Sequence, residues 1–373
     1  MSGIVEFDLG GVVGIRLVGA SPSDARAVER QLGPIRSTLA REPDLVLRFV
    51  ERLDLRSPLR YLGRDDAAFA DDAFLVLRGK QKSRARVRIP LERVGGRCEI
   101  VCESGLAAVP LLVPILNLTA LARGYLPLHA AAFVWEGTGV VATGWSKGGK
   151  TETLLAFCSQ GARYVGDEWV YLAPEGDRMF GIPEPVRLWG WHLDSLPQFR
   201  ARIGARARAR LLSLSWVDRA LARVTRNGAR HRTAVARTLN RLAPLVRGQL
   251  HVDVPPGRLF AANGSAPARP DVFLFVATHE SPDVVVRPID PGGIARRMVH
   301  SLQEEQEPLS SCYRRFRFAF PETRNELLER SREMQEGALA RVLQGKPAFE
   351  LLHPYPVSLP RLFEAARPRC EGR

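Results

Sequence analysis

The chain contains few cysteines, and their arrangement argues against a disulfide-stabilised fold. There are five among 373 residues, an odd number, scattered along the chain from Cys98 to Cys370. A secreted disulfide framework needs an even number at recurring spacings, so we expect a reducing compartment. Cys98, Ile100 and Cys102 alternate, which predicts one buried face of a strand. A metal site is not expected there, because no second Cys or His pair stands at ligand spacing.

Long hydrophobic runs are also lacking. The most apolar segment, Leu106 to Ala122, is interrupted by two prolines, an asparagine and a threonine, and it is shorter than the roughly 20 residues that span a bilayer. We therefore expect a buried helix there and no transmembrane segment. The first residues, Met1 to Gly14, lack the basic start and apolar core of a secretory signal, so a cytoplasmic location is expected.

Acidic residues are almost missing from one stretch of the chain. Between Arg200 and Arg247 there are thirteen arginines, one acid, Asp218, and no lysine, which gives 13 − 1 = +12 of the formal net charge of +14. Such a block predicts an acidic partner, which could be a peptide, a nucleic acid backbone or a membrane surface. The alternative is a general preference for arginine, since arginine outnumbers lysine by 49 to 5 in the chain. Trp216 is the only aromatic residue in this block, unlike a platform for single-stranded nucleic acid.

Lysine is scarce too, yet two of the five lysines lie in one eight-residue segment, Gly144-Trp-Ser-Lys-Gly-Gly-Lys150-Thr151. An apolar run that predicts a strand precedes this segment, and a helical pattern begins at Glu152. Glycines let backbone N–H groups surround phosphate oxygens, Lys150 reaches the terminal phosphates and Thr151 can ligate Mg²⁺. The segment therefore predicts a nucleoside triphosphate site rather than a simple glycine turn. The expected nucleotide-binding residues are Gly144, Ser146, Lys147, Gly148, Gly149, Lys150, Thr151 and Glu152.

The order of the apolar segments predicts an α/β protein in two parts. Residues 1–118 form a smaller β-rich α+β accessory domain with a helix at 24–40. Residues 119–373 form a nucleotide-binding domain with a mixed sheet, flanking helices and an Arg-rich helical insertion at 200–248. Strands are expected at 4–7, 12–17, 45–50, 74–77, 87–89, 99–102, 131–135, 139–142, 163–165, 249–254, 271–277 and 283–288, and further helices at 152–159, 292–303 and 324–344.

Two acids, Asp167 and Glu168, follow the strand predicted at 163–165, shortly after the phosphate loop. Carboxylates at the carboxyl end of a strand beside bound phosphates can hold Mg²⁺ or accept a proton from an attacking hydroxyl. The Asp-Glu pair is a weak signal by itself. Its short distance from the loop makes it a candidate catalytic pair.

Together these segments resemble the HPr kinase/phosphorylase family of bacterial serine kinases, whose nucleotide core is related to phosphoenolpyruvate carboxykinase. The resemblance covers Leu128-His129-Ala-Ala-Ala, Gly-Gly-Lys150-Thr151-Glu152-Thr, Gly161-Ala-Arg163 and Val165-Gly-Asp167-Glu168. The Glu after the hydroxyl residue and the short gap to the acids distinguish this family from most other phosphate-loop enzymes. The family's glycine-rich signature after the acids is not found here, and the Arg-rich block and the N-terminal part have no counterpart.

The resemblance implies a P-loop kinase fold and a role for each matching residue. Lys150 would bind the β and γ phosphates, Thr151 would ligate Mg²⁺ and Asp167 would be the general base. Glu168 falls where a second, metal-binding acid lies, and His129 where a phosphate-contacting histidine lies. A purely Mg²⁺-binding role is the alternative for Asp167, and a core position is the alternative for His129.

These observations predict ATP- and Mg²⁺-dependent phosphoryl transfer to a hydroxyl, with a serine of a peptide or protein as the expected acceptor. In the segment Gly181 to Gly190, Glu184 is a candidate metal ligand and Arg187 a candidate phosphate clamp. Two alternatives stay open: a small-molecule hydroxyl kinase, and a nucleotide-gated binding module that grips an acidic partner with the Arg-rich segment. The sequence leaves open ATP against GTP or pyrophosphate as donor, the acceptor and the oligomeric state. We expect no reverse phosphorolysis.

Overall fold

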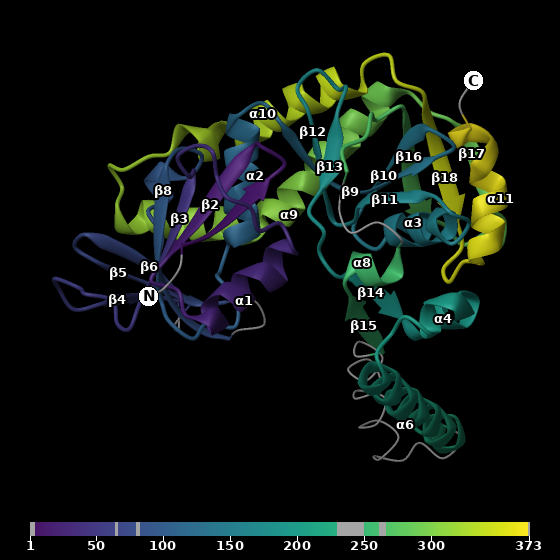
Figure 1. Cartoon of the computed structure of the whole chain (residues 1–373), viewed down its shortest axis with the longest axis horizontal. Helices are drawn as coiled ribbons and strands as arrows, with labels where there is room; N and C mark the ends of the chain where they lie inside the picture. Colours follow the sequence, from purple (N-terminus) through teal and green to yellow (C-terminus); the bar gives the residue numbers. More distant parts are fainter. Residues whose placement is uncertain (1–3, 64–65, 80–82, 230–249, 261–265, 372–373) are drawn as a thin grey trace. The chain divides into compact units, whose positions relative to one another are not determined.

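The computed structural model describes residues 4–63, 66–79, 83–229, 250–260 and 266–371. It confirms an α/β architecture with mixed sheets (Figure 1). The chain forms two compact units, one built from Met1–Glu184 with Gly264–Arg373 and the other from Pro185–Asn263. No helix in the described ranges is long and apolar enough to cross a membrane. The domain boundary predicted near residue 118 stays a prediction.

The first unit contains two eight-stranded sheets, of which the N-terminal one has the order β1-β2-β3-β8-β7-β6-β5-β4. Alternation produces this sheet: in β3 every second side chain is buried, and Cys98, Ile100 and Cys102 are buried along β8. Its elements are β1 (Val5–Leu9), β2 (Val13–Val18), α1 (Pro22–Leu32), β3 (Leu45–Val50), β4 (Arg60–Leu62), β5 (Ala67–Ala70), β6 (Ala73–Arg78), β7 (Arg84–Arg88), the 3₁₀ turn η2 (Leu91–Arg93) and β8 (Cys98–Glu103).

Helix α1 ends earlier than the sequence pattern predicts. Ser21 caps its N-terminus by accepting a hydrogen bond from the backbone N–H of Asp24 at 3.2 Å. At the other end, Gly33 has a φ of 70°, and a Cβ there would lie 2.3 Å from the carbonyl oxygen of Pro183. Only glycine fits this left-handed position, so the helix stops before it, and the predicted extension to residue 40 is wrong.

The second sheet has the order β13-β12-β9-β10-β16-β18-β17, with β11 also paired to β9. β10 runs antiparallel to β9 and parallel to β16, which is parallel to β18. β9 and β10, the first two strands of this sheet along the chain, are therefore an antiparallel pair. The carboxyl ends of the parallel strands β10, β16 and β18 lie at the same end of the sheet. Its strands are β9 (Leu126–Trp135), β10 (Thr138–Thr143), β11 (Arg163–Gly166), β12 (Trp169–Leu172), β13 (Met179–Gly181), β16 (Val272–Thr278), β17 (Val285–Pro288) and β18 (Ala348–His353).

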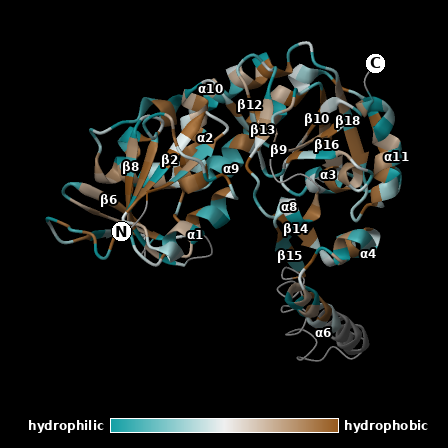
Figure 2. Ribbon diagram, in the orientation of Figure 1, coloured by the Kyte–Doolittle hydropathy of each residue, from teal (hydrophilic) through white to brown (hydrophobic). Residues whose placement is uncertain are grey.

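Besides α1, five helices of the described residues pack around these sheets: α2 (Leu112–Ala122), α3 (Lys150–Cys158), α9 (Pro291–Ala319), α10 (Glu326–Leu343) and α11 (Leu359–Cys370). α2 is buried along most of its length, as the apolar segment predicted. Phe157 of α3 stacks on Phe133 of β9 with ring centroids 4.5 Å apart and touches Phe363 of α11. Hydrophobic residues concentrate on the strands in Figure 2, while the helices carry hydrophilic residues as well.

Helix α9 is longer than predicted, and strand β18 was not predicted. α9 continues through Pro308 to Ala319, so the predicted end at residue 303 is wrong. Proline removes one backbone donor but does not break this helix, because Leu309, Cys312 and Phe316 are buried beyond it.

The second unit contains a two-stranded antiparallel sheet and four helices in the part that the structure describes. They are β14 (Val186–Trp189), α4 (Gly190–Ser195), α5 (Pro197–Arg200), α6 (Ala205–Ala229), β15 (His251–Val254) and α8 (Pro256–Leu259). α6 covers part of the Arg-rich segment predicted to be helical, and its Arg206, Arg208 and Arg210 are exposed. Residues 230–249, which carry five of that segment's thirteen arginines, lie outside the described residues.

Candidate functional site

The segment predicted to bind phosphate connects the buried strand β10 to helix α3. Its conformation requires glycine at two positions, since Gly144 has a φ of 156° and Gly149 a φ of 107°. A Cβ on Gly144 would lie 2.2 Å from the carbonyl oxygen of Val276, and a Cβ on Gly149 would lie 1.9 Å from Nε2 of His353. The loop therefore packs closely against β16 and β18. Backbone N–H groups at the start of α3 can donate to an anion.

Lys150 is held inside this loop. Its ammonium group donates hydrogen bonds to the carbonyl oxygens of Trp145 at 2.9 Å and Gly144 at 3.3 Å. Burial lowers the pKa of Lys150, and the nearby carboxylates of Glu168 and Asp167 partly offset this effect. Within the described part of the chain, the buried ammonium of Lys150 is hydrogen-bonded to carbonyl oxygens, which it can exchange for the stronger acceptor oxygens of a phosphate.

Asp167 follows β11 and lies against the first turn of α3. The Thr151 hydroxyl lies 3.1 and 3.2 Å from the two carboxylate oxygens of Asp167 and donates to them. Burial, strengthened by the negative charge of Glu168, raises the pKa of Asp167 from 3.8 to about 7, although the Thr151 hydrogen bond opposes the change. The structure therefore brings together the two residues predicted as metal ligand and general base.

The two acids sit on a strained turn. Glu168 has a φ of 67°, in the left-handed region, and the backbone N–H of Trp169 donates to the carbonyl oxygen of Asp167 at 2.9 Å across it. This hydrogen bond gives the turn the pattern of a γ-turn. A non-glycine residue in such a conformation costs about 1–3 kcal/mol and is found where the surroundings fix it, often at functional sites.

His129 lies in β9 opposite Trp169 and joins this cluster. Its ring is almost fully buried, with Nε2 3.1 Å from Oε2 of Glu168 and Nδ1 2.9 Å from Oε1 of Glu305. Burial lowers the pKa of His129, but the two carboxylates outweigh burial, so the pKa is raised above its ordinary value. The contact with His129 in turn lowers the pKa of Glu305. His129 therefore has the buried position of a core residue and also contacts Glu168, one of the two acids of the site.

Glu305 is a site residue that the sequence interpretation missed. It belongs to α9, where Met298, Leu302, Leu309 and Cys312 form the buried stripe. Glu305 stands between Leu302 and Leu309 at helical spacing, so a carboxylate occupies a position where the pattern calls for an apolar residue. That mismatch is the signal that could have identified it.

His353 is a second residue that was not predicted. Its Nε2 lies 3.2 Å from the carbonyl oxygen of Gly148 and its Nδ1 lies 2.8 Å from that of Pro354. The side chain is fully buried at the end of β18. It therefore contacts the loop of Gly144 to Thr151 from the end of β18.

Glu184 follows β13, which passes close to the strand that carries Asp167. A Cβ on Gly181 would lie 2.5 Å from the Cα of Gly166, so the two strands approach more closely than any side chain allows. Burial raises the pKa of Tyr164, and the charges of Asp167 and Glu184 raise it further, which indicates that both acids lie near this tyrosine.

Arg187, considered as a phosphate clamp, belongs to the second unit. There its Nε donates to Oδ1 of Asp253 at 3.0 Å across the β14–β15 pair. The guanidinium of Arg187 therefore already has a carboxylate as its hydrogen-bond acceptor. Its role as a phosphate clamp stays a prediction.

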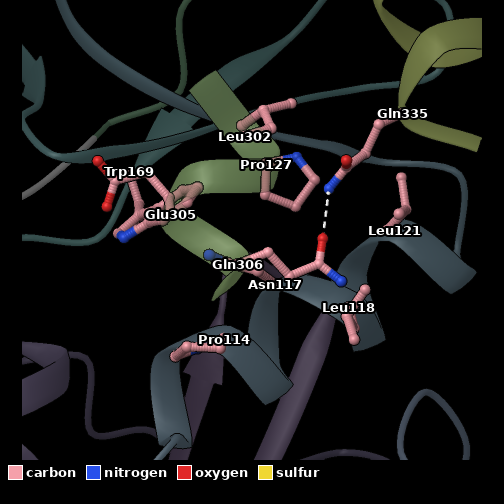
Figure 3. Close-up of a pocket in the computed structure, with 10 residues that line it drawn as sticks. All are labelled: Pro114, Asn117, Leu118, Leu121, Pro127, Trp169, Leu302, Glu305, Gln306 and Gln335. Carbon is pink, nitrogen blue, oxygen red and sulfur yellow. Dashed lines mark hydrogen bonds between the residues drawn. The ribbon is translucent and has the colours of Figure 1, made fainter. Parts of the chain in front are cut away.

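A small pocket adjoins the cluster and is shown in Figure 3. Glu305 and Trp169 form one wall, and amide side chains of α2, α9 and α10 form the other. Gln335 donates to Gln306 at 3.0 Å, and Tyr171 donates to Asn117 at 2.5 Å. These amides are already hydrogen-bonded within the protein, so the pocket is a polar contact between helices. It is lined by Pro114, Asn117, Leu118, Leu121, Pro127, Trp169, Leu302, Glu305, Gln306 and Gln335.

The residues around the loop fit Mg²⁺ by the chemistry of their donor atoms. Thr151, Asp167 and Glu168 offer hydroxyl and carboxylate oxygens, which Mg²⁺ prefers. Within the described ranges no group of three or more His, Cys, Asp and Glu side chains converges on a metal position. Mg²⁺ usually combines one or two carboxylates with substrate phosphates and water, so this ligand set suits it when a nucleotide is bound.

Comparison of the sequence with protein-family models and with curated proteins finds no match.

Proposed function

We propose that this chain is an ATP- and Mg²⁺-dependent kinase of the HPr kinase/phosphorylase type. It transfers the γ-phosphoryl group to a hydroxyl, and the proposed acceptor is a serine of a peptide or protein. The observation that carries the proposal is the contact between Thr151 and Asp167, at 3.1 and 3.2 Å. It sets a buried carboxylate beside the hydroxyl of a phosphate loop, where a hydroxyl acceptor would meet the terminal phosphate.

Binding follows from the loop. The backbone N–H groups at the start of α3 and the ammonium of Lys150 donate to the phosphate oxygens, replacing the contacts of Lys150 with Gly144 and Trp145. Thr151, with the carboxylates of Glu168 and Glu184, would hold Mg²⁺. When bound, this ion supplies positive charge that neutralises the phosphate oxygens.

Transfer requires a group that accepts the acceptor's proton. The acceptor oxygen attacks the γ-phosphorus, the bond from that phosphorus to the bridging oxygen breaks and ADP departs. The hydroxyl proton passes to the carboxylate of Asp167. Its pKa of about 7 suits this role, because a base works best when its pKa lies near the working pH. His129 would donate from Nε2 to an oxygen of the transferred group.

The second unit supplies a candidate docking surface for the acceptor. Arg206, Arg208 and Arg210 are exposed on α6 and carry no acidic neighbour in sequence from 205 to 217. A positive surface of this kind attracts acidic chains and weakens its hold as salt concentration rises. We propose that it binds an acidic segment of the protein or peptide substrate.

The proposal is tested by transfer of label from γ-labelled ATP with Mg²⁺ into an extract of the source organism, divided by ultrafiltration. Wild type is compared with Lys150→Ala, Asp167→Asn and the exposed control Asp283→Asn. We expect label in the large fraction, lost in both site variants and kept in the control. Label in the small fraction would identify a metabolite kinase. ATP binding without label in either fraction would refute the kinase and favour a nucleotide-gated binding module.

A further inference from the structure

The ring of His129 lies between two carboxylates, one at each nitrogen. Nδ1 is 2.9 Å from Glu305 and Nε2 is 3.1 Å from Glu168. Nε2 is hydrogen-bonded to Glu168, and because an ionised carboxylate only accepts, Nε2 is the donor there; Nδ1 faces Glu305 as an ion-pair contact, without a hydrogen bond. The direction of Nε2 is therefore set by what holds Nδ1.

The two carboxylates are held very differently. Glu305 projects from α9, whose Leu302 and Leu309 on either side are buried in the core, and its side chain is 29% exposed. Glu168 stands on the turn with a φ of 67°, and its side chain is 49% exposed. Glu305 is thus the fixed partner of His129, and Glu168 is the partner that can be exchanged.

Glu168 occupies the direction in which another anion would bind. Strand alternation places His129 on the same face of β9 as Phe133, which packs on α3, the helix that begins with the phosphate loop. The charges of Glu168, Asp167 and Glu305 all act on Lys150, so the four side chains share one electrostatic environment. A phosphate oxygen bound near Lys150 is the same kind of acceptor for Nε2 as the carboxylate of Glu168.

We infer that Glu305 is a positioning residue: it holds the His129 ring at Nδ1 so that Nε2 faces the transferred phosphoryl group, which replaces Glu168 as acceptor. This role rests on the proposed function, in which His129 contacts that group. Glu305 itself touches neither substrate nor metal. Removal of a carboxylate that orients a metal-binding histidine typically costs about 10- to 100-fold in affinity or activity, and we expect a loss of the same order for His129.

The test is a double-mutant cycle on transfer from γ-labelled ATP into the fraction of the extract that accepts label. Glu305→Ala and Glu305→Leu remove the acceptor at Nδ1, and the leucine suits the buried stripe of α9, so it guards against a failure to fold. Both should lower kcat about 10- to 100-fold with a much smaller change in KM for ATP, because the loss falls on the transferred group. Glu305→Gln keeps the shape of the side chain and an acceptor oxygen within reach of Nδ1, and it should stay within about threefold of wild type. The neighbouring exposed Glu304→Gln is the matched control and should not change kcat.

The decisive comparison is made in the His129→Ala background. If Glu305 acts through His129, then Glu305→Leu adds no further loss there, whereas independent residues would add their effects in full. Additive losses, or a Glu305→Gln variant as slow as Glu305→Leu, overturn the inference and leave the kinase intact. If wild type transfers no label to any fraction, the proposed function fails, and the role of Glu305 in transfer fails with it.

Discussion

Replacing Asp167 with asparagine should make the protein more stable and at the same time inactive. Asp167 is fully buried, and burial, with the charge of Glu168, raises its pKa from 3.8 to about 7. Between these pH values the folded chain binds the proton more tightly than the unfolded chain. Stability is therefore lost as the pH rises through this window, and above it the ionised carboxylate destabilises the fold by a constant amount.

The magnitude follows from the two pKa values. Each tenfold change in acidity corresponds to about 1.4 kcal/mol, so the change from 3.8 to about 7 sets an upper value of about 4 kcal/mol at pH 8. Asparagine carries no charge at any pH, has the same shape and keeps an oxygen that accepts from Thr151. The variant should thus gain up to about 4 kcal/mol at pH 8 and less than half of that at pH 5.

Urea unfolding of wild type, Asp167→Asn and Asp283→Asn at both pH values measures this difference. Asp283 is exposed, so its variant should match wild type at either pH. The reasoning is refuted if Asp167→Asn is no more stable than wild type at pH 8, or if the gap does not narrow at pH 5. Either result would mean that Asp167 is ionised in the folded protein at little cost.

Three further outcomes are expected. If Asp167 is the base, kcat/KM for transfer should rise about tenfold per pH unit up to about pH 7 and then level off, whereas a flat profile from pH 5 to 8 would exclude it. Gly149→Ala should weaken ATP binding more than tenfold, because its Cβ would lie 1.9 Å from Nε2 of His353. The control Gly161→Ala, at a φ of 103° with open space around the added Cβ, should keep ATP binding and lose only about 1–2 kcal/mol of stability. Equal ATP binding by the two variants would contradict the clash with His353. Phe157→Ala should lower the free energy of unfolding by about 3–5 kcal/mol, and a loss under about 1 kcal/mol would show that the aromatic cluster around it repacks.

The loop, the acids and the strands beside them could be predicted because each depends on residues close together in the chain. The glycines and Lys150 of the loop stand together in one short segment of the sequence, and the short connection from α3 through β11 brings Asp167 back beside Thr151. Alternation in β3 and β8 likewise follows from a local pattern. Contacts of this kind need no knowledge of how distant segments pack.

Glu305 and His353 escaped prediction for the opposite reason. Glu305 reaches His129 only because α9 continues past the length that its sequence pattern indicated. His353 ends a short strand between two prolines, in a tail that otherwise reads as helical. In each case the neighbour in space lies far away in sequence, and the packing of a helix or the order of strands brings the two together. The charged residue on the buried stripe of α9 was the local sign of such a contact.

Two features of the turn at Asp167 and Glu168 each lower the stability of the fold. A buried carboxylate at Asp167 and a left-handed Glu168 each destabilise the fold, although Thr151 is hydrogen-bonded to Asp167 and His129 to Glu168. A turn selected for stability alone would carry asparagine and glycine at these positions, since both changes remove the cost without changing the backbone path. The sequence has the two acids instead, beside the loop at Gly144 to Thr151, and in the proposed function an anion and cations bound there would offset their charge. If Asp167 is the proposed base, the stability gained by Asp167→Asn measures directly how much stability the chain loses by having a base at that position.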